Sequence, residues 1–201
     1  MNKKGILFIV SGPSGVGKGT VLKEVFKMRA DLHFSISATT RAPREGEENG
    51  VHYHFMSREE FAHIRENGGF FENAEFCGNC YGTLNSEVFD YLEKGINVIL
   101  EIEVQGALQI KKKYPEGVFL YVAPPSLKVL EERLKGRKTE DDETIKKRLD
   151  TAKWEITNIG EYDYIVVNDD ISVAACEINS IINAEHTKVS HSLEYIKENL
   201  V

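Results

Sequence analysis

A glycine-rich segment between an apolar run and a helical pattern most constrains how this chain can fold. It reads Ser11-Gly-Pro-Ser-Gly-Val-Gly-Lys-Gly-Thr20, with a lysine directly after Gly17. Ile6–Val10 before it is typical of a strand buried on both faces, and Lys18–Met28 after it carries apolar residues at helical spacing. In this order, Gly-x4-Gly-Lys indicates a phosphate-binding loop, because backbone N–H groups can surround a phosphate whose charge the lysine neutralises.

The loop predicts which residues meet the phosphates of a nucleotide. A glycine-rich turn that binds nothing is the alternative, but such a turn does not require a lysine at this position. Gly19 stands where loops of this kind carry Ser or Thr as a Mg²⁺ ligand, so Thr20 is the candidate there, directly or through water. The residues expected around the phosphates are Gly12, Pro13, Ser14, Gly15, Val16, Gly17, Lys18, Gly19 and Thr20.

The strand–helix unit recurs along the chain. Further apolar, β-rich runs lie at Val98–Ile102, Val118–Val122 and Tyr164–Val167, and each is followed by a helical pattern. Strands that alternate with helices predict a parallel sheet with right-handed crossovers. At 201 residues the chain can bury a sufficient core without disulfides.

Two stretches interrupt this alternation and are predicted to be insertions on the core. Residues 35–86 include a helix start at Ser57, where Ser57-x-x-Glu60 forms a capping box. Residues 126–158 are almost wholly helical, with a break at Gly136. The strand-like runs of the first insertion are Phe34–Ser37, Val51–Phe55 and Phe70–Phe76. The core is then predicted to comprise residues 1–34, 87–125 and 159–201.

Composition argues against several classes of protein. Lys and Arg number 25 against 32 Asp and Glu, and this net charge of −7 disfavours a nucleic-acid or membrane-surface binder. Three cysteines are too few for a disulfide scaffold, and no run approaches the ~18 apolar residues of a membrane span. The first apolar run is too short for a signal peptide, so we expect a cytoplasmic protein. The sequence leaves its oligomeric state open.

Two arginines form a second candidate anion site. Arg41 and Arg44 end the segment Ser35-Ile-Ser-Ala-Thr-Thr-Arg-Ala-Pro-Arg44, beside a proline that stiffens the turn. Paired guanidinium groups suit a phosphate dianion, because each presents a planar fork of donors. Two solvated surface arginines are the alternative, and in isolation they are more common.

With these motifs the sequence resembles the guanylate kinase family, and the resemblance covers nearly its whole length. The resemblance implies an ATP:GMP phosphotransferase that uses Mg²⁺, releases ADP and GDP, and also accepts dGMP. It further implies an α/β fold, in which a parallel phosphate-loop sheet flanked by helices carries a small mixed α/β GMP-binding insertion and a helical lid. The matching segments are Ser11–Thr20, Ser35–Arg44, Gly46–Tyr53, Phe71–Glu75, Gly78–Thr83, Leu100–Gly106, Ala123–Ser126 and Val167–Asp170.

The resemblance also assigns an acceptor site. Guanine offers donors at N1 and N2, which a carboxylate accepts as a pair, whereas adenine leaves that carboxylate unpaired at a cost of ~1–3 kcal/mol. Glu101 and Glu103 stand where many family members carry aspartate, and Glu101 is a further Mg²⁺ candidate through water. The implied guanine-reading residues are Ser37, Glu72, Thr83 and Glu103, and the implied GMP-phosphate ligands are Arg41, Arg44, Tyr53 and Tyr81.

The second insertion is implied to be a lid whose arginines approach ATP. Its closure would bring positive charge to the transferring phosphoryl group and exclude water. A salt-bridged helix face is the alternative, because glutamates such as Glu131 lie close by. The implied catalytic residues are Lys18, Arg41, Arg137 and Arg148, and the further ATP contacts are Arg133 and Asn168.

Other phosphate-loop proteins and a binding module remain as alternatives. A GTPase normally carries Asn-Lys-x-Asp late in the chain, and Asn168-Asp169-Asp170 lacks that lysine. A kinase-like module that has lost catalysis is disfavoured by Lys18 and the lid arginines. A kinase acting on another nucleotide or a sugar phosphate is disfavoured by Glu72 and Thr83.

Overall fold

The computed structural model describes residues 3–76, 78–136 and 142–200. Five parallel strands form the central sheet in the order β2-β7-β1-β8-β9. Each strand except β2 corresponds closely to an apolar run expected from the sequence. The strands are β1 (Leu7–Ser11), β2 (Leu32–Phe34), β7 (Asn97–Glu101), β8 (Val118–Ala123) and β9 (Tyr164–Val167).

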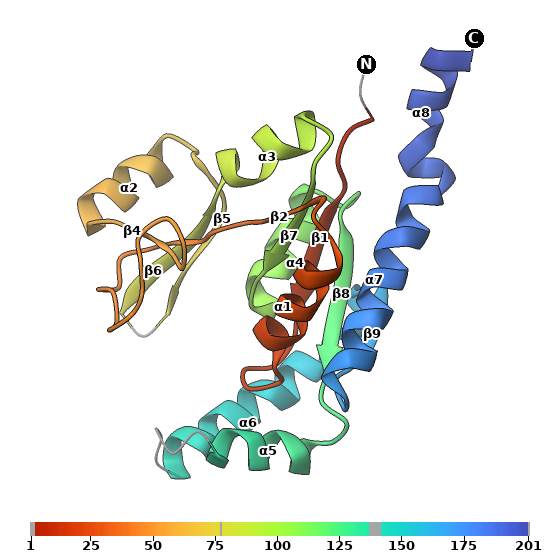
Figure 1. The fold of residues 1–201 in the computed structure, drawn as a ribbon. Coiled ribbons are helices and arrows are strands. Elements are labelled where there is room, and N and C mark those ends of the chain that lie inside the picture. The colour runs from red at the N-terminus through yellow and green to blue at the C-terminus, as the bar shows by residue number, and fades with distance from the viewer. Residues whose placement is uncertain (1–2, 77, 137–141, 201) are drawn as a thin grey trace.

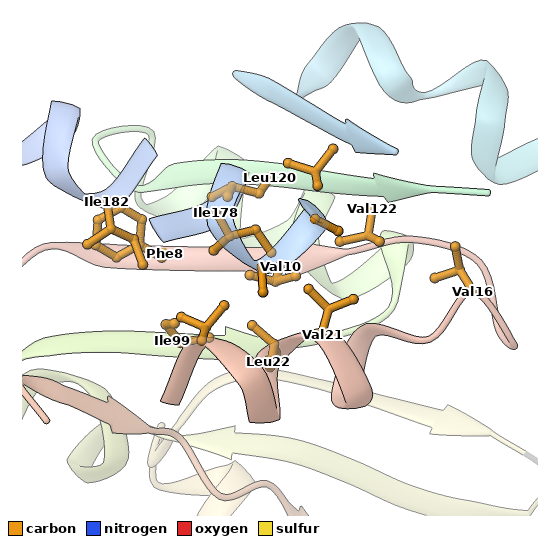
Figure 2. Close-up of a cluster of buried hydrophobic side chains, with 14 of the residues drawn as sticks. Phe8, Val10, Val16, Val21, Leu22, Ile99, Leu120, Val122, Ile178 and Ile182 are labelled. Carbon is orange, nitrogen blue, oxygen red and sulfur yellow. The ribbon is translucent and has the colours of Figure 1, made fainter. Parts of the chain in front are cut away.

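Helices cover both faces of this sheet, as Figure 1 shows. Helices α1 (Lys18–Met28) and α7 (Ile171–Thr187) pack together on one face, and α3 (Asn85–Glu93) and α4 (Val104–Lys113) on the other. Alternate residues of β1 divide between the two layers. Phe8 and Val10 belong to the cluster with α1 and α7 (Figure 2), whereas Leu7 and Ile9 belong to the opposite cluster. Each such buried side chain contributes ~1.5–3 kcal/mol.

A second sheet lies beside the core, in the order β4-β3-β6-β5. It is mixed, since β3 pairs parallel with β4 and antiparallel with β6. Helix α2 (Arg58–Glu66) covers it and begins with the expected capping box at Ser57, and Phe61 of α2 stacks on Phe70 at 4.3 Å. The strands are β3 (Ala38–Thr39), β4 (His54–Phe55), β5 (Phe70–Phe76) and β6 (Asn79–Leu84).

Two of the strands expected in this region have other boundaries, and one strand was missed. The predicted strand Phe34–Ser37 is divided, because β2 ends at Phe34 in the core sheet and β3 begins at Ala38 in the small one. Residues 35–37 pass between the sheets, with Ser35 N donating to Ile99 O and Ser37 O accepting from His54 N. The predicted strand Val51–Phe55 shortens to β4, and β6 was not predicted.

Two helices project from the edge of the sheet at which the strands end, as Figure 1 shows. They are α5 (Leu127–Gly136) and α6 (Asp142–Thr157). Leu130 and Leu134 of α5 and Ile145 and Ala152 of α6 join the α1–α7 cluster. After η1 (Ile159–Glu161) and β9 the chain ends in α7 and α8 (Val189–Leu200); α8 was not predicted. Among the described residues, no helix is long and apolar enough to cross a membrane.

Candidate active site

The phosphate loop joins β1 to α1, and its shape depends on glycines. Gly12, Gly15 and Gly17 have φ angles of 148°, 89° and 96°, which L side chains rarely adopt. A Cβ at Gly12 would also lie 2.2 Å from the carbonyl oxygen of Val122 on β8. Lys18 donates from Nζ to the carbonyl oxygen of Gly12 at 2.6 Å. The loop therefore has both the curled backbone and the lysine that a phosphate site requires.

Two side chains brace this loop. Asn168, directly after β9, is 2% exposed and donates from Nδ2 to the carbonyl oxygen of Val16 at 2.7 Å. Arg133 of α5 donates to the same oxygen at 3.2 Å and to the carbonyl oxygen of Asn168 at 2.9 Å. The sequence predicted ATP contacts for both, and in this structure both hold the backbone of the loop. Asn168 Oδ1 is buried and, among the described residues, has no hydrogen-bond partner.

Helix α6 brings one predicted arginine to the loop. Arg148 donates from Nη1 to Ser14 Oγ at 3.0 Å. Arg148, Thr151 and Glu155 recur at helical spacing, and all three line the cavity that contains Lys18. Arg137, the other predicted lid arginine, lies outside the described residues.

Glu72 and Thr83 form a buried polar pair on the small sheet. They pair in register across β5 and β6, and Thr83 donates from Oγ1 to Glu72 Oε1 at 2.7 Å. Burial raises the pKa of the Glu72 carboxyl above its ordinary value, and the hydrogen bond from Thr83 opposes that shift. A buried carboxylate of this kind is stabilised by further N–H donors. The pair is therefore suited to a ligand that presents N–H groups.

The four predicted GMP-phosphate ligands lie together, and the two arginines contact a carboxylate that was not predicted. Arg41 Nη2 lies 2.9 Å from each carboxylate oxygen of Glu47, and its guanidinium carbon lies 5.4 Å from the ring centroid of Tyr53. Arg44 donates from its backbone N–H to the same carboxylate at 2.7 Å. The rings of Tyr53 and Tyr81 meet edge to face at 6.3 Å. Glu47 thus occupies cationic and N–H donors of the kind that a phosphate requires.

A continuous cleft joins the phosphate loop to the small sheet. Its two adjoining cavities measure about 490 Å³ and about 400 Å³. The first contains Lys18 and Arg148, and the second contains Glu72 and Tyr81. The residues that line both are Ser14, Ser37, Tyr53, Glu101, Ile102 and Glu103. One ligand on the loop and another beside Glu72 would therefore meet within a single space.

Known proteins agree with this architecture in sequence and in structure. The family model for guanylate kinase matches residues 4–185. The chain belongs to the guanylate kinase family. It is 49% identical to the guanylate kinase of Streptococcus thermophilus over 198 residues, covering 98% of this chain and 95% of that protein. It is 50% identical to that of Clostridioides difficile over 196 residues, covering 98% and 96%.

A solved structure gives the same result for the fold. The crystal structure of guanylate kinase from Anaplasma phagocytophilum superposes with a TM-score of 0.79 at 32% identity, covering 98% of this chain and 96% of that one. The predicted fold class, a helix-flanked parallel sheet with a small mixed second sheet, is confirmed.

Glu101 and Glu103 line both cavities, and carboxylate oxygens are ligands that Mg²⁺ prefers. Glu101 ends β7, and its Oε2 lies 3.4 Å from where a Cβ on Gly19 would stand. Burial raises the pKa of the Glu101 carboxyl, and the charge of Lys18 opposes this. Thr20, the other predicted candidate, has an exposed side chain in the first turn of α1. Glu101 therefore approaches the position at which other phosphate loops present a hydroxyl, and its oxygens suit Mg²⁺.

Glu155 is the functional candidate that sequence reasoning missed. It is 6% exposed, and burial raises its pKa to about 7, with Lys18 opposing the shift and Glu103 adding to it. Its spacing from Arg148 was the available signal, because residues seven apart on a helix share a face. Glu47 gave no comparable signal, since its role depends on how residues 41–47 turn.

Proposed function

We propose that the chain transfers the γ-phosphoryl group of ATP to GMP, giving ADP and GDP, with dGMP as a further acceptor. One observation carries this proposal: the cleft is continuous from Lys18 on the phosphate loop to the buried Glu72–Thr83 pair. Two nucleotides bound at its ends would place an attacking phosphate oxygen close to the γ-phosphorus. Such positioning supplies much of the rate enhancement in phosphoryl transfer.

At the donor end, the loop binds the phosphates and cations stabilise the charge that develops. Backbone N–H groups of residues 14–19 surround the β-phosphate, and Lys18 moves from the carbonyl of Gly12 to the phosphate oxygens. Arg148 joins them, as does Arg137 when the helices α5 and α6 close. Asn168 Oδ1, a buried acceptor, accepts from the 6-amino group of adenine.

At the acceptor end, GMP replaces an internal anion. Its phosphate displaces the carboxylate of Glu47 from Arg41 and from the backbone of Arg44, while Tyr53 and Tyr81 donate to its oxygens. This exchange keeps Arg41 paired before and after binding, so the guanidinium is oriented in advance.

The base is read at the buried end of the acceptor site. Glu72 accepts from N1 and N2 of guanine, and Thr83, Ser37 and Glu103 complete the set. The burial of Glu72 on β5 of the small sheet supports this assignment, because adenine would leave the buried carboxylate without donors.

Magnesium fits the carboxylates between the two ends. Glu101 would hold the ion through water, with Thr20 as the weaker candidate, and Glu103 lies close enough along the chain to contribute. When bound, the ion neutralises phosphate charge.

The division of the molecule follows from these roles. We assign residues 1–34, 87–125 and 159–201 to the phosphate-loop core, residues 35–86 to GMP binding and residues 126–158 to the lid. Both substrates are cytoplasmic metabolites, and we assign the protein to that compartment.

A coupled assay of ADP release tests the activity, with GMP, dGMP, AMP, UMP and CMP as acceptors. Turnover is expected with GMP and dGMP, and AMP turnover comparable to that with GMP would contradict the guanine-reading assignment. Lys18→Ala should lower kcat by at least about 100-fold, because it removes a charge at the transferring group. Lys23→Ala, an exposed lysine of the same helix, is the matched control.

A further inference from the structure

A single carboxylate joins three segments at the junction between the two sheets. Glu87, in the first turn of α3, lies with Oε2 2.9 Å from His33 Nε2 and with Oε1 3.0 Å from His54 Nε2. The backbone N–H of Ile36 donates to the same Oε2 at 3.1 Å. His33 belongs to β2 of the core sheet, His54 belongs to β4 of the small sheet, and Ile36 lies in the connection between them.

The surroundings of this cluster hold it in place. The Glu87 side chain is 15% exposed, and those of His33 and His54 are 17% and 29% exposed. The ring of His33 stacks on that of Tyr91, one turn along α3, with centroids 3.4 Å apart and planes 6° apart. Burial raises the pKa of Glu87, but the Ile36 N–H and both histidines outweigh it and hold the pKa below its ordinary value. The carboxylate is therefore ionised at neutral pH, when its hydrogen bonds are strongest.

Two of the residues that bond to Glu87, Ile36 and His54, are adjacent in sequence to residues that line the cleft. Ile36 precedes Ser37, and His54 follows Tyr53; Ser37 and Tyr53 line both cavities. The backbone N–H of His54 also donates to the carbonyl oxygen of Ser37 at 2.9 Å. Glu87 thus fixes the backbone beside two acceptor-site residues relative to β2, which pairs with β7 of the core.

We propose that Glu87, clamped between His33 and His54, is a positioning residue that sets the acceptor half of the cleft against the phosphate loop. The inference deepens the proposed function and depends on it for the identity of the ligand, GMP. Glu87 touches neither nucleotide, and its loss acts through Ser37 and Tyr53. ATP binds to the loop on the core, which the cluster does not reach, so affinity for GMP depends on Glu87 and affinity for ATP does not.

Steady-state kinetics of Glu87→Ala separates this role from a general loss of structure. We expect KM for GMP to rise about 10-fold, the loss of one charge-assisted network, with KM for ATP within about 2-fold of the wild type. Glu87→Gln keeps an acceptor for Ile36 and should recover part of the loss. Glu93→Ala, at the exposed end of the same helix, is the control and should match the wild type. Equal rises in both KM values, or no rise for GMP, would overturn the proposal.

A double-mutant cycle of His54→Gln and Glu87→Gln tests the same proposal without Glu87→Ala, in case that variant folds poorly. His54→Gln removes one arm and leaves the bonds of Glu87 to His33 and Ile36. It should raise KM for GMP about 3-fold alone and add little in the Glu87→Gln background, because the residues act as one unit. Additive effects would show that the histidine acts independently of Glu87 and would contradict the clamp.

Hydrogen exchange measures the clamp without any turnover, so its result is independent of the proposed function. In Glu87→Gln and His54→Gln the backbone amide of His54 should exchange at least about 5-fold faster, with those of β1 unchanged. A wild type that fails to phosphorylate GMP would refute the proposed function, and exchange would still decide whether Glu87 fixes the junction. Unchanged exchange at His54 would refute the clamp.

Discussion

Glu72 shows how one buried carboxylate can decide which base a site accepts. Among the described residues its carboxylate accepts hydrogen bonds from Thr83 alone, and the side chain lines the acceptor cavity, where it can accept from a ligand. Burial has already raised its pKa. Acidification through that raised pKa protonates Glu72, and a protonated carboxyl accepts from guanine less well than the carboxylate does.

Glu72→Gln should lower kcat/KM for GMP about 10- to 100-fold, which corresponds to the ~1–3 kcal/mol of an unmatched buried donor. The amide places an N–H group against one of the two guanine donors. Initial rates at subsaturating GMP measure the effect, and Glu66→Gln, exposed at the end of α2, serves as control. A variant with wild-type kcat/KM would remove Glu72 from the base-reading site.

The raised pKa of Glu155 predicts that activity with ATP depends on pH, and that the Glu155→Gln variant lacks this dependence. With a pKa of about 7 it ionises at neutral pH and then places negative charge near Lys18, in the cavity that takes the phosphates of ATP. The wild-type kcat/KM for ATP should therefore decline above pH 7, and Glu155→Gln should retain activity there. Profiles of both proteins between about pH 5.5 and 9 test this; superimposable alkaline limbs would contradict it.

The same ionisation changes stability in a defined direction. The folded-state pKa of Glu155 lies above its unfolded value of 4.5, so wild-type stability falls as pH rises between the two pKa values. Relative to the wild type, Glu155→Gln should gain about 1–2 kcal/mol between pH 4.5 and pH 8. Thermal unfolding at both pH values measures the gain, and a constant difference would show that the pKa is not shifted.

At the scale of elements, the phosphate loop depends on contact with a segment distant in sequence. Gly17 combines a φ of 96° with a position at which a Cβ would lie 2.7 Å from Asn168 Nδ2. Gly17→Ala should therefore destabilise the protein by about 1–3 kcal/mol and raise KM for ATP at least about 10-fold. Denaturation and ATP titration test both effects. Gly160→Ala, where nothing lies within 4 Å of the added Cβ, should change neither.

The elements that the sequence predicted well are those with a local signal. The apolar runs of β1, β7, β8 and β9 and the capping box at Ser57 each specify their own structure. Strand β6 reads Asn-Cys-Tyr-Gly-Thr-Leu, which has no apolar alternation, and pairing with β5 and β3 makes it a strand. Residues 35–37 form no strand, because Ser35 bonds to β7 of the core sheet whereas Ser37 bonds to β4 of the small sheet.

The residues of the candidate site likewise fall into those that a local motif predicts and those that it does not. Lys18 and the loop glycines follow from a motif that lies within ten residues, so their placement was predictable. Glu87 and Glu155 act through partners in other elements, and Glu47 acts through the turn of its own loop, neither of which a local sequence pattern reveals.

For the whole molecule, net charge is a poor guide to what the cleft binds. The chain carries −7, yet cations from separate elements, Lys18 of α1 and Arg148 of α6, line one cavity, and Arg44 lines the next. The same cavities also hold carboxylates such as Glu101 and Glu103, so the position of each charge along the cleft, and not the total charge, decides what binds there. The cleft lies where the strands of the parallel sheet end, the usual position of ligand sites in α/β proteins.

The fluorescence of Trp154 should distinguish ATP from GMP binding, because α6 is expected to move when the ATP end of the cleft is occupied. Trp154 is the sole tryptophan and lies 43% exposed on α6, between Arg148 and the end of the helix, so fluorescence reads this helix alone. A non-hydrolysable ATP analogue should draw Arg148 inward and change the emission of Trp154, whereas GMP, bound at the small sheet, should change it much less. The ATP response should disappear in Lys18→Ala and persist in Glu72→Gln. Equal responses to the two nucleotides would show that α6 does not move as a lid over the donor site.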